Sequence, residues 1–219
     1  MPHLTQSPVV VCNLNILLMT KTIATLLLIF SSGLCYCQTT DTSKVKRGTF
    51  DIYDELRKKQ TKDGVEKLTY LDSTFNFQVE IPNWLNLKET GTVYAFGGTL
   101  PAVDGIKNAI LIKVFDKVKF LTLLDFKKFI VEDNEFGQSP KWSASHKFMG
   151  KKELGKYNDI GDSYKVYLMR DNLLYHCEYV LVETKSAYLW IDYTSTQGTF
   201  DKNFAKFEEF MSGFKVTNF

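Results

Sequence analysis

Two serines and a histidine are the residues of this chain whose types and spacing come nearest to catalytic chemistry. Ser143, Ser145 and His146 lie close together, and Asp162 could approach them in space to complete a serine–histidine–aspartate triad. The sequence has no Gly-x-Ser-x-Gly motif to expose a nucleophile, and a serine beside a histidine is common in loops. A hydrolase that uses Ser145, His146 and Asp162 is therefore kept only as an alternative.

Cys177 is the other candidate nucleophile, and it follows His176 directly. Both lie in a predicted strand, where successive side chains point to opposite faces, so they cannot act as a pair. We interpret Cys177 as a small core residue and His176 as a structural or surface residue. The sequence contains no paired histidine, paired cysteine or clustered carboxylate spacing typical of a metal site. We therefore predict no enzyme activity, no metal and no cofactor.

The charge of the chain is nearly balanced. Lys and Arg number 27 against 25 Asp and Glu, which gives a net charge of +2. Nucleic-acid-binding proteins normally carry a clustered basic face, so this balance argues against a nucleic-acid partner. The longest basic run, 44–47, lies in a polar stretch and is interpreted as a solvated linker.

The N-terminal region has the pattern of a secretion signal. Lys21 provides a positive start, Ile23 to Phe30 form a short apolar segment, and small and polar residues precede Gln38. The apolar segment is shorter than the roughly 20 residues that a stable membrane span needs. We expect cleavage after Cys37 and export of the remaining chain to the periplasm or the outside of the cell, with no stable membrane span in the mature form.

Two features of this region stay open. Residues 1–18 are either an artefact of the gene start, with Met19 as the true start, or part of a long n-region of the signal. Cys37 could carry a lipid because Leu34 stands three positions before it, although the bulky Tyr36 directly precedes it. Cleavage after residue 37 leaves Cys177 as the single cysteine, so the mature chain cannot form an internal disulfide.

The rest of the chain is expected to comprise a polar leader, 38–66, with a short helix near residues 50–56, and one globular domain, 67–219. Alternating apolar residues over 75–81 predict a strand that Pro82 ends. The nearly continuous apolar run 109–115 predicts a central strand. Asp171-Asn172 predicts a hairpin turn. Helical spacing predicts a helix from Leu123, capped by Thr122 with Asp125 three residues on and stopped by Gly137. The same spacing predicts a helix from Phe200, capped by Thr199 and ended by Gly213.

Strands in hairpin-like succession with two separated amphipathic helices indicate an α+β domain. We expect one antiparallel sheet flanked by helices on both faces, an α/β/α sandwich.

The order of these segments resembles the PsbP-like family, named after the extrinsic P subunit of photosystem II. Segment 75–84, Phe-Asn-Phe-Gln-Val-Glu-Ile-Pro-Asn-Trp, is similar to that family's first strand and its Pro-x-Trp corner. Segments 189–195 and 200–216 are similar to its last strand, helix and terminal strand. The resemblance covers about residues 67–216. It implies an α/β/α sandwich with a largely non-catalytic role in binding or assembly, and it supplies no catalytic residues or metal ligands.

Binding to a protein or an envelope component is thus the predicted function. Trp142 lies in a predicted loop beside Lys141, where a large aromatic residue suggests a partner surface. The glycine-rich segment 97–108, with Gly98 and Pro101, is predicted to be a long loop that contributes to the same surface. The alternative is that Trp142 covers the edge of the sheet as a lid on the core. A carrier of a small apolar ligand is the alternative function.

The proposed cleavage gives a direct prediction. Protein purified from the native host should begin at Gln38, as determined by intact-mass and N-terminal peptide mass spectrometry. A cytosolic product that retains Met1 or Met19 would contradict export.

Overall fold

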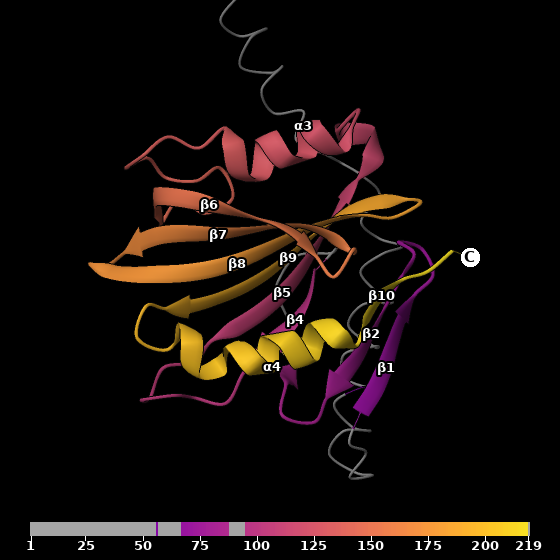
Figure 1. Cartoon of the computed structure of the whole chain (residues 1–219), viewed down its shortest axis with the longest axis horizontal. Coiled ribbons are helices and arrows are strands. Elements are labelled where there is room, and N and C mark those ends of the chain that lie inside the picture. The colour runs from indigo at the N-terminus through magenta and orange to yellow at the C-terminus, as the bar shows by residue number, and fades with distance from the viewer. Residues whose placement is uncertain (1–55, 57–66, 88–94, 219) are drawn as a thin grey trace, which may run out of the picture. The chain divides into compact units, whose positions relative to one another are not determined.

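The computed structural model describes Leu56, residues 67–87 and residues 95–218, all within the unit Val45–Phe219 (Figure 1). The predicted signal segment, its cleavage point and most of the predicted leader lie outside the described residues. Leu56 is helical and buried in the hydrophobic core, with 9% of its surface exposed.

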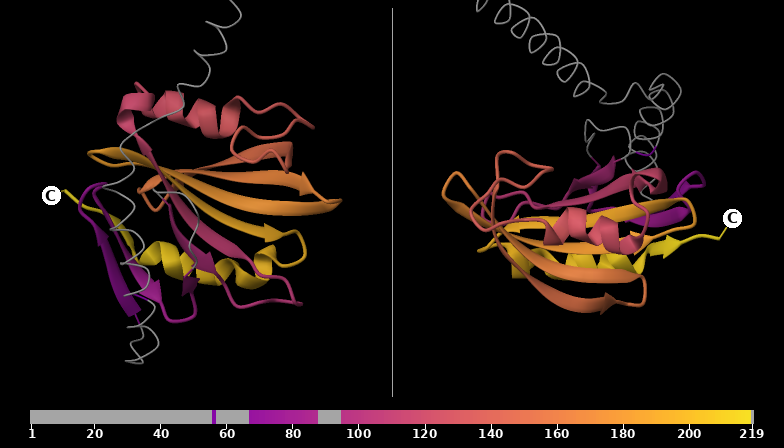
Figure 2. Two further views of the ribbon diagram at one scale, coloured as in Figure 1. Left: turned by 180° about the vertical axis from the view of Figure 1, so that it is seen from behind. Right: turned by 90° about the horizontal axis from the view of Figure 1, so that it is seen from above.

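Within the described residues the fold is mostly antiparallel sheet with two short helices, as Figures 1 and 2 show. The strands are β1 (Lys67–Asp72), β2 (Phe77–Pro82), β3 (Asn86–Leu87), β4 (Ala95–Thr99), β5 (Ala109–Asp116), β6 (Lys147–Tyr157), β7 (Gly161–Arg170), β8 (Leu173–Glu183), β9 (Ala187–Thr196) and β10 (Phe214–Val216). The helical segments are η1 (Lys117–Lys119), α3 (Leu123–Lys127) with its π-helical continuation η2 (Lys128–Glu132), and α4 (Phe200–Ser212).

The strands form two sheets, so the expectation of a single sheet is wrong. The smaller has the order β1-β2-β10, and the larger has the order β3-β4-β5-β9-β8-β7-β6. Every pairing of neighbouring strands within these sheets is antiparallel. Strand β5 lies inside the larger sheet between β4 and β9, as its apolar sequence predicted.

The first hairpin follows the predicted pattern. In β2 the side chains of Phe77, Val79 and Ile81 are buried and those between them are partly exposed, as alternation requires. Asp72 shapes the preceding turn, because its Oδ1 accepts hydrogen bonds from the backbone N–H groups of Thr74 and Phe75 at 3.1 and 3.0 Å.

The hairpin turn predicted between β7 and β8 is also confirmed. Asp171 and Asn172 have φ values of 51° and 60°, the left-handed conformation that a two-residue turn needs at both positions. Arg170 and Leu173 face each other across this turn. Short polar side chains tolerate this conformation better than most, so the missing glycine does not prevent the turn.

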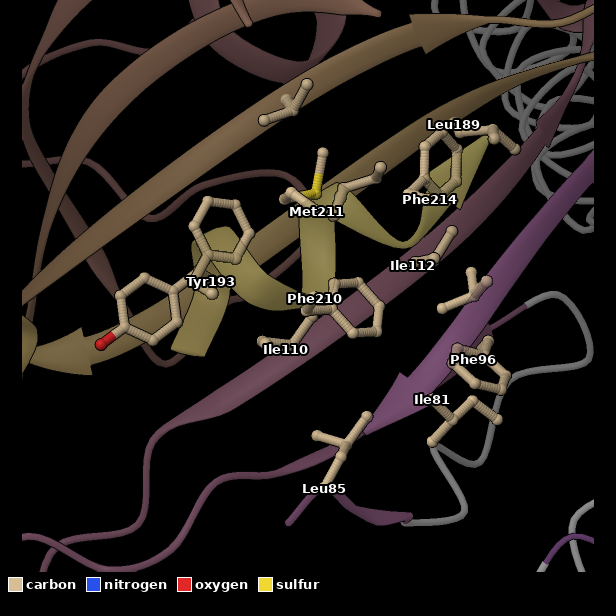
Figure 3. Close-up of a cluster of buried hydrophobic side chains, with 14 of the residues drawn as sticks. Ile81, Leu85, Phe96, Ile110, Ile112, Leu189, Tyr193, Phe210, Met211 and Phe214 are labelled. Atoms are coloured by element: carbon tan, nitrogen blue, oxygen red, sulfur yellow. The ribbon is translucent and has the colours of Figure 1, made fainter. Parts of the chain in front are cut away.

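Two hydrophobic clusters take alternate residues from β8 and β9. Ile191 packs in the first cluster. Leu189 does so together with Phe210 and Met211 of α4 (Figure 3). The second cluster contains Phe126, Ile130 and Val131 of α3 and η2, together with Cys177, Tyr179, Leu181, Tyr188 and Trp190. Both strands are therefore buried along their middle on either side, which explains their unbroken apolar runs.

The helix from Leu123 begins as predicted, because Thr122 and Asp125 form a reciprocal capping box. It ends earlier than the predicted stop at Gly137. After α3 the hydrogen bonds widen to the π pattern, and the N–H of Asp133 donates to the carbonyl of Lys128 at 2.8 Å.

The ends of α4 fall where predicted but for other reasons. Thr199 stands at the N-cap position without a side-chain bond to the helix, and its hydroxyl instead donates to Oδ1 of Asn108 at 3.0 Å. Gly213 ends the helix with a φ of −88°, so no left-handed turn is involved. Glycine fits here because an added Cβ would lie 2.8 Å from Cβ of Glu80.

The long loop predicted over 97–108 is wrong at its start. Gly97 and Gly98 are buried in β4, and the loop begins only at Leu100. Strand β4 lies between β3 and β5, and an added Cβ on Gly98 would lie 2.6 Å from the carbonyl oxygen of Asn86. The glycines thus permit close backbone contact inside the sheet.

This packing predicts the effect of a methyl group. Gly98→Ala should lower the free energy of unfolding by about 1–3 kcal/mol, because the backbone of β3 must move. Gly198→Ala is the matched control, because an added Cβ there meets nothing within 4 Å, and its change should stay within about 0.5 kcal/mol. Urea unfolding of both variants measures this, and equal stabilities would contradict the close contact.

Candidate functional site

Trp142 is partly buried and rests edge-on against two aromatic rings of the sheet. Its ring centroid lies 5.2 Å from that of Trp190 in β9 and 6.3 Å from that of Tyr179 in β8, at interplanar angles of 66° and 72°. Tyr179 and Trp190 are themselves 4.9 Å apart in the same edge-to-face manner. Such contacts are favourable for aromatic pairs and hold the Trp142 ring in one orientation.

The loop that carries Trp142 is tied to β6 by backbone hydrogen bonds. The N–H of Gly137 donates to the carbonyl of Phe148, and the N–H of Phe148 donates to the carbonyl of Gln138, both at 2.7 Å. Pro140 is buried, and its carbonyl accepts from the N–H of Ser143 at 3.0 Å. These bonds fix the backbone on both sides of Trp142.

Lys141 extends from the same loop into solvent. Half of its side chain is exposed, its Nζ lies 3.5 Å from Oδ2 of Asp133 and 5.5 Å from the ring centroid of Phe129. An exposed ion pair of this length contributes little to stability. Trp142 and Lys141, two of the four residues predicted to form a partner surface, thus lie next to each other in one loop.

Two charged residues lie in the sheet next to the ring of Trp190. Nζ of Lys113 in β5 lies 4.2 Å from the centroid of that ring, and Asp192 in β9 accepts a hydrogen bond from Oγ1 of Thr194 at 2.7 Å. Burial lowers the pKa of Lys113, an effect that the charge of Asp192 opposes. Burial raises the pKa of Asp192 to about 6, although Thr194 and Lys113 act in the other direction.

Two buried polar groups of the second hydrophobic cluster are the thiol of Cys177 and the indole N–H of Trp190. Burial raises the pKa of the Cys177 thiol well above its usual value, which suits a core residue and not a nucleophile. The indole Nε1 of Trp190 is buried and has no hydrogen-bond partner within the described ranges. An unpaired buried donor is rare and costs stability.

Gly98 and Pro101 do not join Trp142 and Lys141 in one surface, so this part of the predicted site is wrong. Gly98 is buried inside β4, and therefore offers no surface to a partner. Pro101 is exposed, but its carbonyl accepts from Nδ2 of Asn203 in α4 at 3.2 Å. The helix α4 packs in the first hydrophobic cluster, whereas Trp142 packs against the second.

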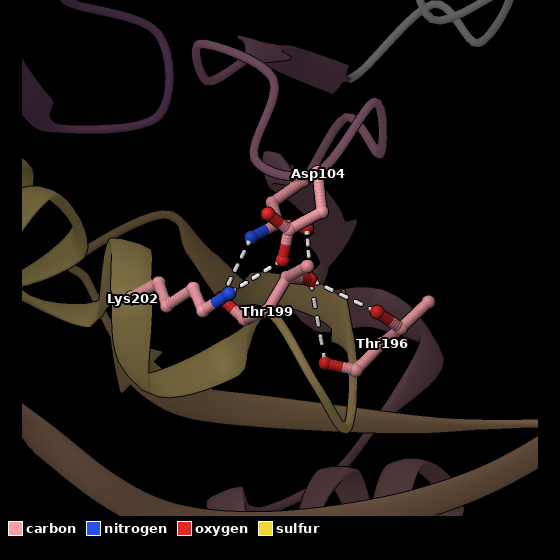
Figure 4. Close-up of polar contacts among 5 residues, drawn as sticks. Asp104, Thr196, Thr199 and Lys202 are labelled. Carbon is pink, nitrogen blue, oxygen red and sulfur yellow. Dashed lines mark hydrogen bonds and ion pairs between the residues drawn. The ribbon is translucent and has the colours of Figure 1, made fainter.

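A buried polar network holds the Pro101 loop against the start of α4 (Figure 4). Asn108, fully buried, donates from Nδ2 to the carbonyl of Thr199 at 3.2 Å and accepts from its hydroxyl at 3.0 Å. The hydroxyls of Thr196 and Thr199 lie 2.9 Å apart, and Lys202 forms an ion pair with Asp104 outside the network. These bonds give the loop a structural role, since they satisfy groups that burial removes from water.

The side chains named for a hydrolase do not form a triad. Oγ of Ser143 and of Ser145 lie 2.6 and 3.2 Å from the same nitrogen of His146, Nδ1. Asp162 is instead ion-paired with Lys127 and, at 2.7 Å, with Lys156.

The register of the β6–β7 hairpin separates Asp162 from His146. Asp162 pairs with Lys156, whereas Lys147, the neighbour of His146, pairs with Met169 at the other end of β7. At about 3.3 Å per residue, Asp162 and Met169 are roughly 23 Å apart. Asp162 therefore cannot act on His146.

Sequence reasoning missed Lys113 and Asp192. Each interrupts an otherwise apolar strand sequence, Ala-Ile-Leu-Ile-Lys-Val-Phe in β5 and Leu-Trp-Ile-Asp-Tyr in β9. A charged residue inside an apolar strand sequence indicates a special environment, because charged side chains are rarely buried without a partner. Their common location next to Trp190 depends on the pairing of β5 with β9.

No family model and no curated protein matches this chain. Among solved structures it is similar to the cyanobacterial PsbP of Synechocystis, with 10% identity over 71% of this chain and 95% of that chain, and a TM-score of 0.41. It is also similar to LpqN of Mycobacterium tuberculosis, a protein involved in cell envelope biogenesis, with 11% identity over 72% and 87% of the two chains and a TM-score of 0.36. A Pseudomonas aeruginosa protein of unknown function has 13% identity over 67% and 94%, and a TM-score of 0.38.

With TM-scores below 0.5, these similarities assign no family, and we draw the function from the chain's own residues. Within the described part of the chain, no helix has the length and apolar character of a membrane span. The same residues contain no group of three or more histidine, cysteine or acidic side chains placed to hold a metal ion.

The raised pKa of Asp192 predicts a pH-dependent stability. Between its ordinary value of 3.8 and about 6, the folded state holds a proton on this carboxyl that the unfolded state has lost. Asp192 therefore reduces stability as the pH rises through this window. Asp192→Asn should become more stable than the wild type by about 1–3 kcal/mol over the same window and keep that difference above it.

Urea unfolding of both proteins at several pH values from 4 to 8 measures this difference. Thr194→Val serves as a second variant, because it removes a hydrogen bond that lowers the Asp192 pKa and should move the window to higher pH. A difference between wild type and Asp192→Asn that does not change with pH would contradict the raised pKa.

Proposed function

We propose that this chain is an exported, non-catalytic binding or assembly module that contacts a protein or envelope component through the surface formed by Trp142 and Lys141. The observation that carries the proposal is the support of Trp142 by Trp190 and Tyr179. A tryptophan held in one orientation loses little entropy on binding, and tryptophan is among the residues that contribute most to protein interfaces.

The neighbourhood of Trp142 supports binding over simple coverage of the core. Lys141 presents a half-exposed charge next to it. The amine of Lys113, which lies over the ring of Trp190, is a donor that a partner's acceptor groups would suit. In the lid alternative, Trp142 serves only to shield Trp190 and Tyr179, and no partner is needed.

The non-catalytic part of the proposal is supported by the state of the candidate nucleophiles. The hydroxyls of Ser143 and Ser145 both approach one nitrogen of His146, and its other nitrogen has no carboxylate partner within the described ranges. Burial lowers the pKa of His146, and burial keeps Cys177 protonated. This arrangement lacks the nucleophile–base–acid order that acyl transfer uses.

For the fold we propose the α/β/α sandwich implied by the PsbP-like resemblance, with α3 and α4 on opposite faces of the larger sheet. Support comes from the two clusters, since β8 and β9 give alternate side chains to them, and α4 packs in the first and α3 in the second. The secretion-signal pattern ahead of Gln38 supports export to the periplasm or beyond.

The alternative function, a carrier of a small apolar ligand, has less support. The ring of Tyr193 in β9 stacks on that of Phe207 in α4 at 5.2 Å, and Phe200 and Phe204 lie within 6.1 Å of Tyr193. These aromatic rings fill the region between α4 and the sheet where such a ligand would be held.

Charge reversal at the surface tests the proposal without disturbing the core. Lys141→Glu should reduce recovery of the partner from the native envelope fraction by about tenfold or more, measured by quantitative mass spectrometry after affinity capture. Lys202→Glu is the matched control, because Lys202 is equally exposed and also paired with one aspartate, but lies on α4.

Trp142→Ala provides the second arm of this test and should abolish the same interaction. Urea unfolding shows whether Trp142→Ala remains folded, and Lys141→Glu keeps the test valid if it does not. Unchanged recovery with Lys141→Glu and with a folded Trp142→Ala would refute this surface and favour the lid interpretation.

A further inference from the structure

Three aliphatic side chains project into solvent where β5 leads into α3. Leu121 is 94% exposed, Val118 is 89% exposed and Leu124 is 54% exposed. We call these three residues the apolar tip. Single exposed apolar residues are common on proteins, but three within seven positions form a local patch that calls for an explanation.

The segment that carries the apolar tip is anchored in the hydrophobic core. Between the tip residues, Phe120 and Leu123 pack against the second hydrophobic cluster. The ring of Phe120 lies 5.3 Å from those of Phe126 and Phe129. Because the intervening side chains are held inward, Val118 and Leu121 point outward from a fixed backbone.

Hydrogen bonds at both ends also hold the apolar tip. Oδ1 of Asp116 accepts from the N–H of Val118 at 2.9 Å and so caps η1. Oδ2 of Asp125 accepts from the N–H and the hydroxyl of Thr122 at 3.0 and 2.8 Å. The two acidic side chains within residues 116–125 thereby accept hydrogen bonds from polar groups of the same stretch. Glu132, four positions after Lys128, is exposed.

Fewer of the lysines in this segment have ion-pair partners. Lys117 pairs with Glu183 at 2.6 Å. Lys119 and Lys128 are exposed, and neither has an ion-pair partner among residues 67–87 and 95–218. Lys128 follows Leu124 by four positions and lies on the same side of the helix. The tip therefore carries amines beside its aliphatic side chains.

We propose that the apolar tip docks on the surface of a bilayer that contains anionic phospholipid. Val118, Leu121 and Leu124 enter the boundary between headgroups and acyl chains, while Lys119 and Lys128 bind the lipid phosphates. Segments that lie on membranes combine these two features, exposed apolar side chains and neighbouring lysines.

The composition of the tip favours a lipid surface over a protein partner. Protein interfaces are enriched in tyrosine, tryptophan and arginine and depleted in lysine at their centre. The apolar tip has aliphatic side chains with lysines, and its side chains project outward. This docking is independent of the proposed surface at Trp142, because neither Trp142 nor Lys141 belongs to the tip.

Vesicle binding of the full chain is the first test, with phosphatidylcholine vesicles that contain or lack phosphatidylglycerol. Leu121→Ser should weaken binding to the anionic vesicles by about tenfold. Lys119→Gln and Lys128→Gln should each weaken it roughly fivefold. High salt, about 0.5 M, should lower the affinity of the wild type but affect the double lysine variant less.

Matched controls come from another part of the surface. Leu173→Ser is compared with Leu124→Ser, because Leu173 is 51% exposed at the β7–β8 turn. Lys107→Gln is compared with Lys119→Gln, since Lys107 is exposed in the loop that follows Pro101. Both controls should bind as tightly as the wild type.

Depth-dependent quenching distinguishes docking by the tip from binding by the apolar N-terminal segment of the full chain. Brominated acyl chains should quench the indole introduced by Leu121→Trp several-fold more than the one introduced by Leu173→Trp. Equal quenching in the two variants, or equal binding by Leu121→Ser and wild type, would overturn the proposal and leave the tip as a contact for a protein.

Discussion

The burial of β8 and β9 on both of their sides is the constraint on which the rest of the structure depends. Each strand sends alternate residues into two separate hydrophobic clusters, and α4 packs in the first and α3 in the second. Neither strand can therefore shift its register by one residue without exchanging the contents of the two clusters. The turn at Asp171 and Asn172 reinforces this register from one end.

The same burial determines how polar residues behave near Trp190. Lys113 and Asp192 have lost much of their contact with water. Burial therefore lowers the pKa of Lys113 and raises the pKa of Asp192. Lys113 reduces part of this cost through the electron-rich face of the Trp190 ring. The two strands thus keep two charged residues inside a largely apolar region, and the shifted pKa values of Lys113 and Asp192 are the consequence.

The segment from η1 to η2 connects that core to the two surfaces proposed for binding. Phe120 and Phe126 anchor it in the second cluster, and Leu121 and Leu124 between them project the opposite way. The loop that carries Trp142 follows the same segment and rests on the same cluster. Because the inward-facing side chains fix the backbone, the outward-facing side chains are also held in place. Side chains held in place lose less entropy on binding.

The sequence by itself determined those features that depend on neighbours along the chain. Alternation predicted β2, the capping pair Thr122 and Asp125 predicted the start of α3, and Asp171-Asn172 predicted a turn, since backbone sterics and hydrogen bonds over a few residues decide each of them. Only the tertiary structure decided that Gly98 lies inside a sheet, that Asp162 is remote from His146, and that Lys113 and Asp192 flank Trp190. Those outcomes depend on which strands pair and in which register, and pairing is a property of the whole domain that no local spacing records.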